Sequence, residues 1–208
     1  MSRIGRYLVF ALLVFPAALL AAPSEPGGAP PPDPLPNSLK GQLLIATEGM
    51  LDPRFDHAVI LMVSHDREGA FGIVINRPAG EKPLADILAA FGRNTPATGS
   101  VPVFLGGPVQ LEVSFTIHGS DYSRPQTRDV DAGLAVTPSG EVLEDIARNQ
   151  GPARSLVAFG YAGWGPGQLE NEISRNAWYM APADPGIVFD DDRSKVWEHA
   201  VARRTQDL

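Results

Sequence analysis

Three short segments combine turn-forming residues with polar side chains that could contact a ligand. Each follows a run of apolar residues that is predicted to form a buried strand, and strand-end loops often carry binding groups. We expect these segments, at 76–78, 106–108 and 163–168, to converge on one concave patch. The candidate binding residues are Asn76, Arg77, Gly106, Gly107, Trp164, Gln168 and Glu172. The alternative for each segment is turn chemistry without a ligand, since Gly, Pro and Asn all favour turns.

The segment from Gly160 to Glu172 is the most unusual, because it has four glycines within residues 160–167. It follows a predicted strand and precedes a predicted helix, whose N-terminal N–H groups favour an anion. Two glutamates near the beginning of that helix already supply negative charge. We expect Glu172 to lie close enough to Arg175 to pair with it, which leaves Gln168 best placed to contact a ligand. The alternative is a tight turn in which Trp164 packs on the core.

The motifs of common enzyme classes are missing from the sequence. It contains no G-x-S-x-G elbow, Walker A loop, H-E-x-x-H motif or complete dinucleotide-binding fingerprint. It also contains no cysteine, which excludes disulfides, thiolate zinc sites and a cysteine nucleophile. A cofactor-free enzyme could use Glu172, His65 or Arg77, but these residues form no set of nucleophile, base and orienting group. We therefore expect no cofactor and no metal.

Two further polar clusters have simpler explanations. His65 lies in the segment 64–68 between two predicted strands, where a metal or acid–base role competes with the expected solvated turn. The run Asp190–Asp192 lacks the glycine and the distal glutamate of a calcium loop. We expect this run to be the acidic beginning of the last helix.

The elements that would position these residues alternate between strand and helix periodicity. Continuously apolar runs at 57–63 and 70–75 predict two strands that are buried on both faces and joined in a hairpin. Pro83 would open a helix whose apolar stripe begins at Leu84. Further strands are predicted at 43–47, 101–105, 113–118, 133–136, 156–161 and 178–181, and further helices after 138, from 168 and at 193–203.

Two local patterns predict how the chain meets solvent. Apolar and polar residues alternate over 113–118, which indicates a strand with one wet face. Pro78 is expected to turn the chain out of the sheet. Hairpins mixed with crossover helices predict a mixed sheet with helices packed on it, in the α/β class or at its border with α+β.

Composition limits the class of partner. The chain has 208 residues, 44% hydrophobic and 20% charged, with a formal net charge of −7. This composition is typical of a globular protein, and the length predicts one domain with a tail. The acidic balance argues against nucleic acid bound through a broad basic face.

The N-terminal region resembles a targeting signal. Arg3 and Arg6 precede an apolar run, 7–22, that is shorter than a membrane span. We predict a signal peptide over 1–22, a proline-rich linker over 23–38 and a folded domain over 39–208. The protein would then be exported, to the periplasm, with membrane contact only through the signal. The alternative is a cytoplasmic protein whose start codon is mis-assigned.

Most of the predicted domain resembles the AlgH/YqgE family of bacterial proteins. The matching segments are Gly41–Ala46, Asp52–Phe55, Gly69–Pro78, Leu105–Val109, Gly160–Glu170, Asn176–Trp178 and Pro182–Asp184. The resemblance implies a single α/β domain with a mixed, partly barrel-like sheet flanked by helices. The family has no established enzymatic activity, although some members are labelled transcriptional regulators. Asn171 stands where an acidic residue is common, and the N-terminal extension is unlike typical members, which begin near Gly41.

Two functions therefore remain, from different classes. The first is a non-catalytic binding or regulatory module whose strand-end loops hold a protein or a small ligand. The second is a cofactor-free enzyme acting at the same loops. The missing catalytic set favours the first, and a titratable group with a shifted pKa beside a cleft would favour the second.

Overall fold

The computed structural model describes residues 37–190 and 192–205. The predicted signal peptide and the predicted linker up to residue 36 lie outside the described residues, so both stay predictions. The first strand begins at Gln42, shortly after the predicted beginning of the domain at Leu39.

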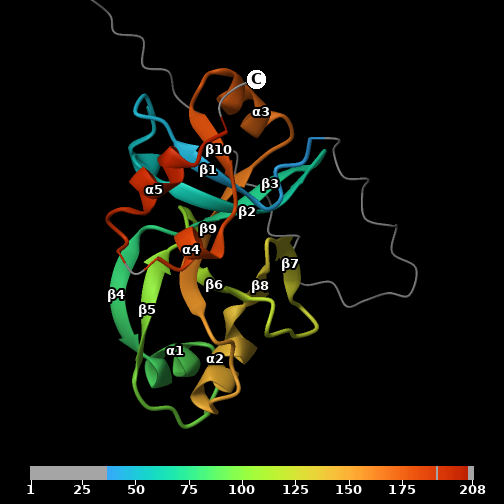
Figure 1. Ribbon diagram of the computed structural model, residues 1–208. Coiled ribbons are helices and arrows are strands. Elements are labelled where there is room, and N and C mark those ends of the chain that lie inside the picture. The colour runs from blue at the N-terminus through green and yellow to red at the C-terminus, as the bar shows by residue number, and fades with distance from the viewer. Residues whose placement is uncertain (1–36, 191, 206–208) are drawn as a thin grey trace, which may run out of the picture. The chain divides into compact units, whose positions relative to one another are not determined.

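Ten strands form one sheet within the described residues (Figure 1). They are β1 (Gln42–Ala46), β2 (Val59–Asp66), β3 (Gly69–Val74), β4 (Pro78–Pro83), β5 (Ser100–Leu105), β6 (Val109–Gly119), β7 (Arg128–Asp131), β8 (Leu134–Pro138), β9 (Ser155–Trp164) and β10 (Trp178–Pro182). The order is β10-β1-β2-β3-β9-β6-β8-β7, and β5 pairs with both β9 and β4. Only the β5–β9 pair is parallel among the described pairs. The predicted mixed sheet is confirmed.

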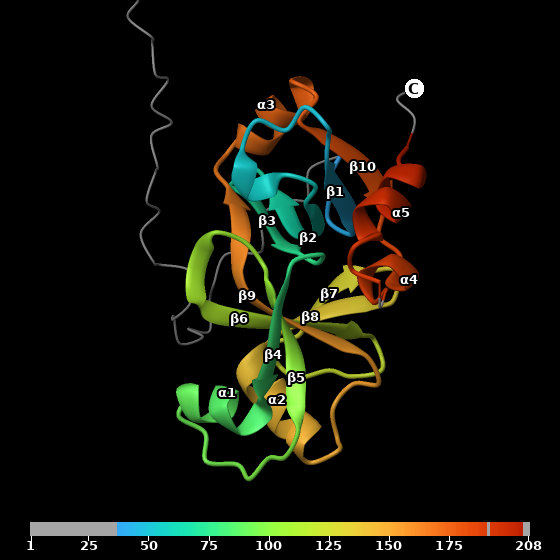
Figure 2. The same cartoon turned by 90° about the vertical axis from the view of Figure 1, so that its left-hand side faces the viewer.

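Five α-helices of the described residues pack beside this sheet. They are α1 (Leu84–Ala90), α2 (Ser139–Ala147), α3 (Gln168–Ser174), α4 (Pro185–Val188) and α5 (Val196–Ala202), and a 3₁₀ turn, η1, covers Pro53–Phe55. In Figures 1 and 2, α3, α4 and α5 accompany the β1–β10 part of the sheet, whereas α1 and α2 lie together beyond β4 and β5. The structure is therefore a single mixed α/β domain with helices flanking the sheet, as expected.

The sheet is open, but it curls until its two ends approach. Gly41, just before β1, has a φ of +77°, and a Cβ added there would lie 2.6 Å from Cβ of Asp131 at the end of β7. Gly41 therefore has two reasons to be glycine, a left-handed backbone and a close neighbour. This approach gives the sheet its partly barrel-like character.

The hydrophobic core divides between the two faces of the sheet. Along β2, alternate residues point to opposite sides, so Val59 and Leu61 join one buried cluster and Ile60 and Met62 join another. Helices α4 and α5 close the first cluster, and α3 covers the second. A third cluster lies between α1, α2 and strands β5 and β9. The continuously apolar strands are thus buried on both faces, and the predicted β2–β3 hairpin is confirmed.

The prediction that Pro78 leaves the sheet is wrong. Residues 78–83 form β4, which pairs antiparallel with β5, and all six residues are exposed. Proline is tolerated there because β4 is an edge strand and needs no donor on its outer side. Helix α1 begins at Leu84 with Pro83 at the N-cap, one position later than expected.

The predicted wet face of β6 is also wrong. Ser114, Thr116 and His118 are 5%, 0% and 0% exposed. Helix α2 packs against this side of the strand, where the Thr116 hydroxyl donates to the Ser139 hydroxyl at 2.9 Å. Thr116 and His118 find hydrogen-bond partners inside the protein, whereas the buried Ser114 hydroxyl has none among the described residues.

Several element boundaries differ from the sequence prediction. Strand β9 continues through the glycine-rich segment to Trp164, so only residues 165–167 form the turn before α3. Gly160 lies within the strand at a φ of +74°, packed against the carbonyl oxygen of Gly107. The last helix begins at Val196 instead of residue 193. Strand β7 and helix α4 are additional to the predicted elements.

Candidate functional site

Asn76 and Arg77 lie where β3 passes into β4, and both hold the segment that follows η1. The Asn76 side chain accepts from the Val59 amide at 2.9 Å and donates to the His57 carbonyl at 2.8 Å. The Arg77 guanidinium donates to the carbonyl oxygens of Arg54 and Asp56. Asn76 is thus engaged with the backbone, whereas Arg77 uses only two of the five N–H donors of its guanidinium in these bonds.

The glycine segment before β6 lies beside this junction. The Leu105 amide donates to the Arg77 carbonyl at 2.9 Å, and the Val74 amide donates to the Gly106 carbonyl at 2.8 Å. A Cβ on Gly107 would lie 2.2 Å from the Tyr161 carbonyl oxygen, so the backbone there packs directly on β9. The first two predicted segments therefore meet, and their glycines serve close backbone packing.

The third predicted segment does not join them. Trp164 pairs with Ala70 at the beginning of β3, whereas Asn76 and Arg77 follow the end of that strand. The Trp164 side chain is 7% exposed and packs edge-on against Trp178, with ring centroids 6.1 Å apart. The expectation of one shared patch is wrong, because β3 separates its parts. The alternative, Trp164 packed on the core, is what the structure has.

Glu172 binds the two buried tryptophans instead of a ligand. Its Oε2 accepts the indole N–H groups of Trp164 and Trp178, both at 2.9 Å. Its Oε1 accepts from the Gln168 amide at 3.0 Å, and the Gln168 oxygen accepts from the Gly165 amide at 3.2 Å. Gln168 was expected to contact a ligand, and Glu172 was expected to pair with Arg175. In the structure both side chains belong to this cluster instead.

His65 is buried instead of solvated. It is 6% exposed, its Nδ1 accepts from the Leu39 amide at 3.1 Å, and its Nε2 lies 3.0 Å from Glu170 Oε1. The backbone bond to Nδ1 places the ring proton on Nε2, which donates to the carboxylate. The solvated-turn expectation is therefore wrong, since His65 fastens the beginning of the domain to α3.

A pocket of about 340 Å³ opens beside Asn76 and Arg77. Segments from η1–β2, β3–β4 and the N-terminal side of α5 bring its walls together. Its lining residues are Asp56, His57, Asn76, Arg77, Arg193, Ser194, Trp197 and Glu198. This volume is in the range of small-ligand sites. Two predicted residues, Asn76 and Arg77, thus belong to a pocket, while the other predicted residues lie outside it.

The aromatic wall of this pocket is preorganised. The Trp197 indole donates to the Ala46 carbonyl at 2.8 Å, and its ring meets His57 edge-on with centroids 4.5 Å apart. His57 has a φ of +52°, a conformation that costs energy for a residue with a Cβ. The bond from Asn76 to the His57 carbonyl holds this conformation.

The charged groups of the pocket have both signs. His57 Nδ1 lies 2.7 Å from Asp56 Oδ1, which leaves Nε2 as the acceptor of the neutral ring. Arg193 donates to the Val188 carbonyl at 2.8 Å and lies over the Phe104 ring. Ser194 donates to Asp192 at 2.5 Å. The pocket can therefore offer guanidinium donors and an imidazole acceptor to one ligand.

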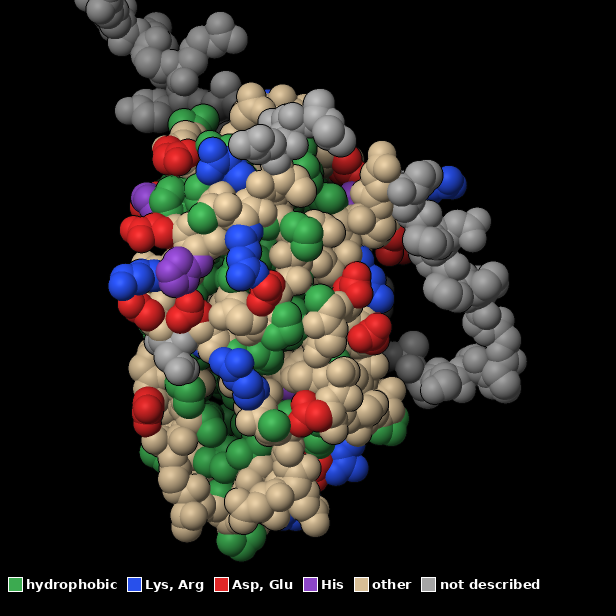
Figure 3. Space-filling view, viewed as in Figure 1, with side chains coloured by type: hydrophobic (Ala, Val, Ile, Leu, Met, Phe, Trp, Pro, Cys, Tyr) green, Lys and Arg blue, Asp and Glu red, His purple; other side chains and the backbone are tan. Residues whose placement is uncertain are grey.

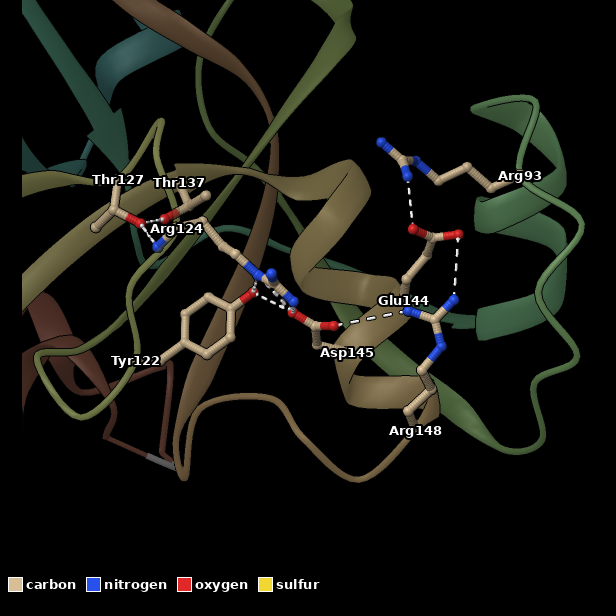
Figure 4. Close-up of polar contacts among 8 residues, drawn as sticks. All are labelled: Arg93, Tyr122, Arg124, Thr127, Thr137, Glu144, Asp145 and Arg148. Carbon is tan, nitrogen blue, oxygen red and sulfur yellow. Dashed lines mark hydrogen bonds and ion pairs between the residues drawn. The ribbon is translucent and has the colours of Figure 1, made fainter.

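A second polar cluster centres on two carboxylates of α2 (Figure 4). Glu144 accepts from Arg93 at 2.6 Å and from Thr95 at 2.6 Å. Asp145, 2% exposed, accepts from Tyr122 at 2.6 Å and from Arg124. Burial acts to raise the pKa of Asp145, but these hydrogen bonds outweigh it and hold that pKa below the ordinary value.

Sequence reasoning missed most of the pocket. Asp56, His57, Arg193 and Trp197 come from two segments far apart in the chain, and α5 was predicted only as a core helix. The one available signal was the adjacent acid and histidine at 56–57. Among the described residues, no group of three or more acidic or histidine side chains is arranged to hold a metal ion. On the face in Figure 3, acidic and basic side chains are interspersed, without a large patch of one sign.

The open mixed sheet, flanked by helices, defines a single-domain α/β protein. An AlgH-like family model matches residues 43–208, so the chain belongs to the AlgH-like family. A UPF0301 protein of Methylococcus capsulatus is 44% identical over 161 residues, 77% of this chain and 88% of that protein. A UPF0301 protein of Ruegeria pomeroyi is 44% identical over 166 residues, 78% and 90% of the two chains.

A solved structure supports the same assignment. The solution structure of the AlgH protein from Pseudomonas aeruginosa has a TM-score of 0.69 and 41% identity, over 81% of this chain and 90% of that one. The family resemblance predicted from the sequence is thereby confirmed, and with it the fold. Among the described residues, no helix is both long and apolar enough to cross a membrane.

Proposed function

We propose that this protein acts, through its pocket, as a non-catalytic binding module whose ligand is a small molecule with an acidic group beside a flat ring. The observation that carries the proposal is the pocket in which Arg77 and Trp197 meet. Arg77 is held by two backbone carbonyls and keeps further N–H donors, which suit the paired oxygens of a carboxylate or phosphate.

The other walls of the pocket refine this choice. Trp197 offers an aromatic surface, and aromatic rings prefer to pack against other flat groups. With Nδ1 engaged by Asp56, the Nε2 atom of His57 is the ring nitrogen that would hydrogen-bond to the ligand. Glu198 adds negative charge at the same pocket, so the ligand should carry a hydrogen-bond donor as well as its acidic group.

Calorimetric titration of the full chain with paired probes tests the proposal. Benzoate and phenyl phosphate carry a ring, whereas acetate and inorganic phosphate carry the same acids without one. We expect each ring-bearing probe to bind more tightly than its partner. Arg77→Gln should weaken binding roughly tenfold to a hundredfold, because a hydrogen bond to a charged group is lost.

Two further variants separate binding from folding. Arg175→Gln removes the same charge from an exposed position on the C-terminal side of α3 and should leave affinity unchanged. Glu198→Gln removes a negative charge from the pocket and leaves the backbone contacts of Arg77 intact. Because that charge repels an anion, the substitution should tighten binding of every anionic probe. Equal affinities in wild type, Arg77→Gln and Glu198→Gln would contradict the proposal. The absence of binding by all four probes would contradict it as well.

The pair formed by Asp56 and His57 favours a second candidate function, a cofactor-free enzyme that moves a proton in the same pocket. A histidine oriented by a carboxylate at 2.7 Å is a common general base. In that case His57→Gln would abolish turnover of a bound substrate while leaving its affinity nearly unchanged. A ligand that is recovered unaltered from both wild type and His57→Gln supports the binding module.

We also propose that the protein is exported and binds no nucleic acid directly. The basic start and short apolar run support export. The negative net charge supports the absence of a nucleic-acid partner.

A further inference from the structure

A row of hydrogen-bonded side chains leads from the loop before β7 into the domain. The Thr127 and Thr137 hydroxyl oxygens lie 2.6 Å apart, and Thr137 Oγ1 lies 2.8 Å from Nε2 of His118. On the other side of the ring, Nδ1 lies 2.8 Å from the Gly119 carbonyl oxygen. Thr137 and His118 are 2% and 0% exposed, whereas Thr127 is only half-buried. Figure 4 shows the two threonine hydroxyls side by side.

The direction of each bond in this row follows from its partners. A carbonyl oxygen only accepts, so Nδ1 of His118 carries the proton. Burial lowers the pKa of His118, so the ring is neutral near pH 7 and Nε2 is an acceptor. Thr137 therefore donates to Nε2. Since its only proton is used there, Thr137 accepts from Thr127.

Thr127 is thus a hydroxyl whose proton points into the protein. Its oxygen also accepts the Arg124 backbone N–H at 2.7 Å, and one lone pair remains. The neighbouring residues 123–126 are exposed, so this lone pair lies in a solvent-exposed loop. A hydroxyl that is linked to a base through one further hydroxyl, and that keeps a lone pair available, has the arrangement of a nucleophile activated through a relay.

We propose that Thr127 is a nucleophile for acyl transfer from small activated esters, with Thr137 and His118 as positioning residues that carry its proton. This site is separate from the pocket at Arg77, so the proposal does not depend on the proposed function.

The atoms of the proposed reaction balance. Thr127 Oγ1 attacks the ester carbonyl carbon and forms a new carbon–oxygen bond. Its proton passes to Thr137, and the proton of Thr137 passes to Nε2 of His118. When the intermediate collapses, the bond to the leaving alcohol breaks, and the alcohol takes a proton from the Thr137 hydroxyl, which regains one from Nε2 of His118. The products are acylated Thr127 and the free alcohol, and nothing is oxidised or reduced.

The surroundings of His118 set the pH at which this relay operates. The Tyr122 ring meets the imidazole edge-on with centroids 5.1 Å apart. Burial lowers the pKa of His118, while the Gly119 carbonyl and the negative charge of Asp121 act in the opposite direction. The rate of acylation should therefore rise with pH through a midpoint below 6.5, the ordinary histidine value.

The test uses p-nitrophenyl acetate and the full chain. We expect a burst of p-nitrophenolate and an acetyl group on Thr127 in peptide mass mapping. Thr127→Ser should retain the burst and Thr127→Val should lose it, whereas Thr98→Val, at an exposed threonine, should have no effect. Thr137→Val should slow acetylation of Thr127 roughly a hundredfold, the usual contribution of an acid–base group.

A structural role alone would give a different result. His118→Gln keeps a polar group but cannot titrate, so the pH dependence of Thr127 acetylation should disappear in that variant. Unfolding by urea identifies any variant that fails to fold. If His118→Gln or Thr137→Val fails to fold, the pH profile of acetylation at position 127, in wild type and in Thr127→Ser, tests the proposal. Acetylation confined to lysines, or Thr127 acetylation that is independent of pH and of Thr137, would overturn the proposal.

Discussion

At the scale of single residues, Glu172 was predicted to bind a ligand, but in the structure it bonds to two packed tryptophans. Its carboxylate accepts two indole N–H groups, so Glu172→Gln would place an N–H group or a weaker carbonyl against them. We expect the free energy of unfolding to fall by about 1–3 kcal/mol, the cost of an unsatisfied buried donor. Urea denaturation followed by tryptophan emission measures this change.

Glu68→Gln is the matched control for Glu172→Gln, because Glu68 is an exposed turn residue. It should change stability by less than about 0.5 kcal/mol. Equal effects of the two substitutions would show that the indole bonds contribute nothing. The sequence predicted that Trp164 could pack on the core, but it could not identify the carboxylate that binds both tryptophans. That contact depends on the meeting of α3, β9 and β10.

His118 predicts a pH dependence of stability at the same scale. Its folded-state pKa is lowered by burial, so the unfolded chain binds more protons at acid pH than the folded chain. The contribution is present above 6.5 and is lost as the pH falls from 6.5 through the folded-state pKa. In His118→Gln this slope should be absent from a series of denaturation curves, whereas His199→Gln, half exposed, should keep it. Parallel pH profiles of wild type and His118→Gln would contradict the prediction.

At the scale of elements, Asp145 holds α2 to the loop before β7. Asp145→Asn weakens the bonds from Tyr122 and Arg124, and should lower the free energy of unfolding by about 1–3 kcal/mol. Because hydrogen bonds hold the pKa of Asp145 below its usual value, wild type should lose this contribution as the pH falls through that lowered pKa. Denaturation of both proteins at neutral and acid pH measures the difference, which should shrink in acid.

The matched control for this element is Asp129→Asn, an exposed position on β7. A difference between wild type and Asp145→Asn that is constant from neutral to acid pH would contradict the assignment to the ionised carboxylate. The comparison also tests whether α2 depends on this anchor, since no side chain caps its N-terminus.

Strands and helices could be predicted where burial imposes a periodic pattern of apolar residues. They could not be predicted where contact with another element determines the local structure. The β2–β3 hairpin and α1 follow from their apolar patterns. Strand β4 does not, because none of its six exposed residues carries a hydrophobic signal beyond Pro and Ala, and only pairing with β5 makes it a strand. The polar face of β6 is buried because α2 packs against it, where Ser139 accepts from Thr116. Only part of the pocket could be predicted. Arg77 follows the end of a predicted strand, but α5 lies far along the chain and its contact with this region depends on the fold.

At the scale of the whole molecule, net charge predicts the absence of direct DNA binding. Removal of residues 1–22 would leave a net charge of −9, and on the face in Figure 3 basic side chains are interspersed with acidic ones. Long-range repulsion from phosphates then opposes association. A mobility-shift assay with duplex DNA at low salt should show no complex at micromolar protein. Salt-dependent binding below that concentration would reverse this conclusion.

The N-terminal segment makes the last prediction, which concerns where the molecule is found. Arg3 and Arg6 followed by a short apolar run have the organisation of a secretory signal, and the chain lacks the cysteine that lipid attachment would require. Expressed in a bacterium with two membranes, the protein should appear in the periplasmic fraction with roughly 20 residues removed, by intact-mass analysis. Leu13→Arg interrupts the apolar run and should keep the full-length chain in the cytoplasm, whereas Ser24→Ala lies beyond it and should be exported normally. A full-length wild-type chain in the cytoplasm would instead support a mis-assigned start, because the domain from Leu39 onward would then fold there without any signal.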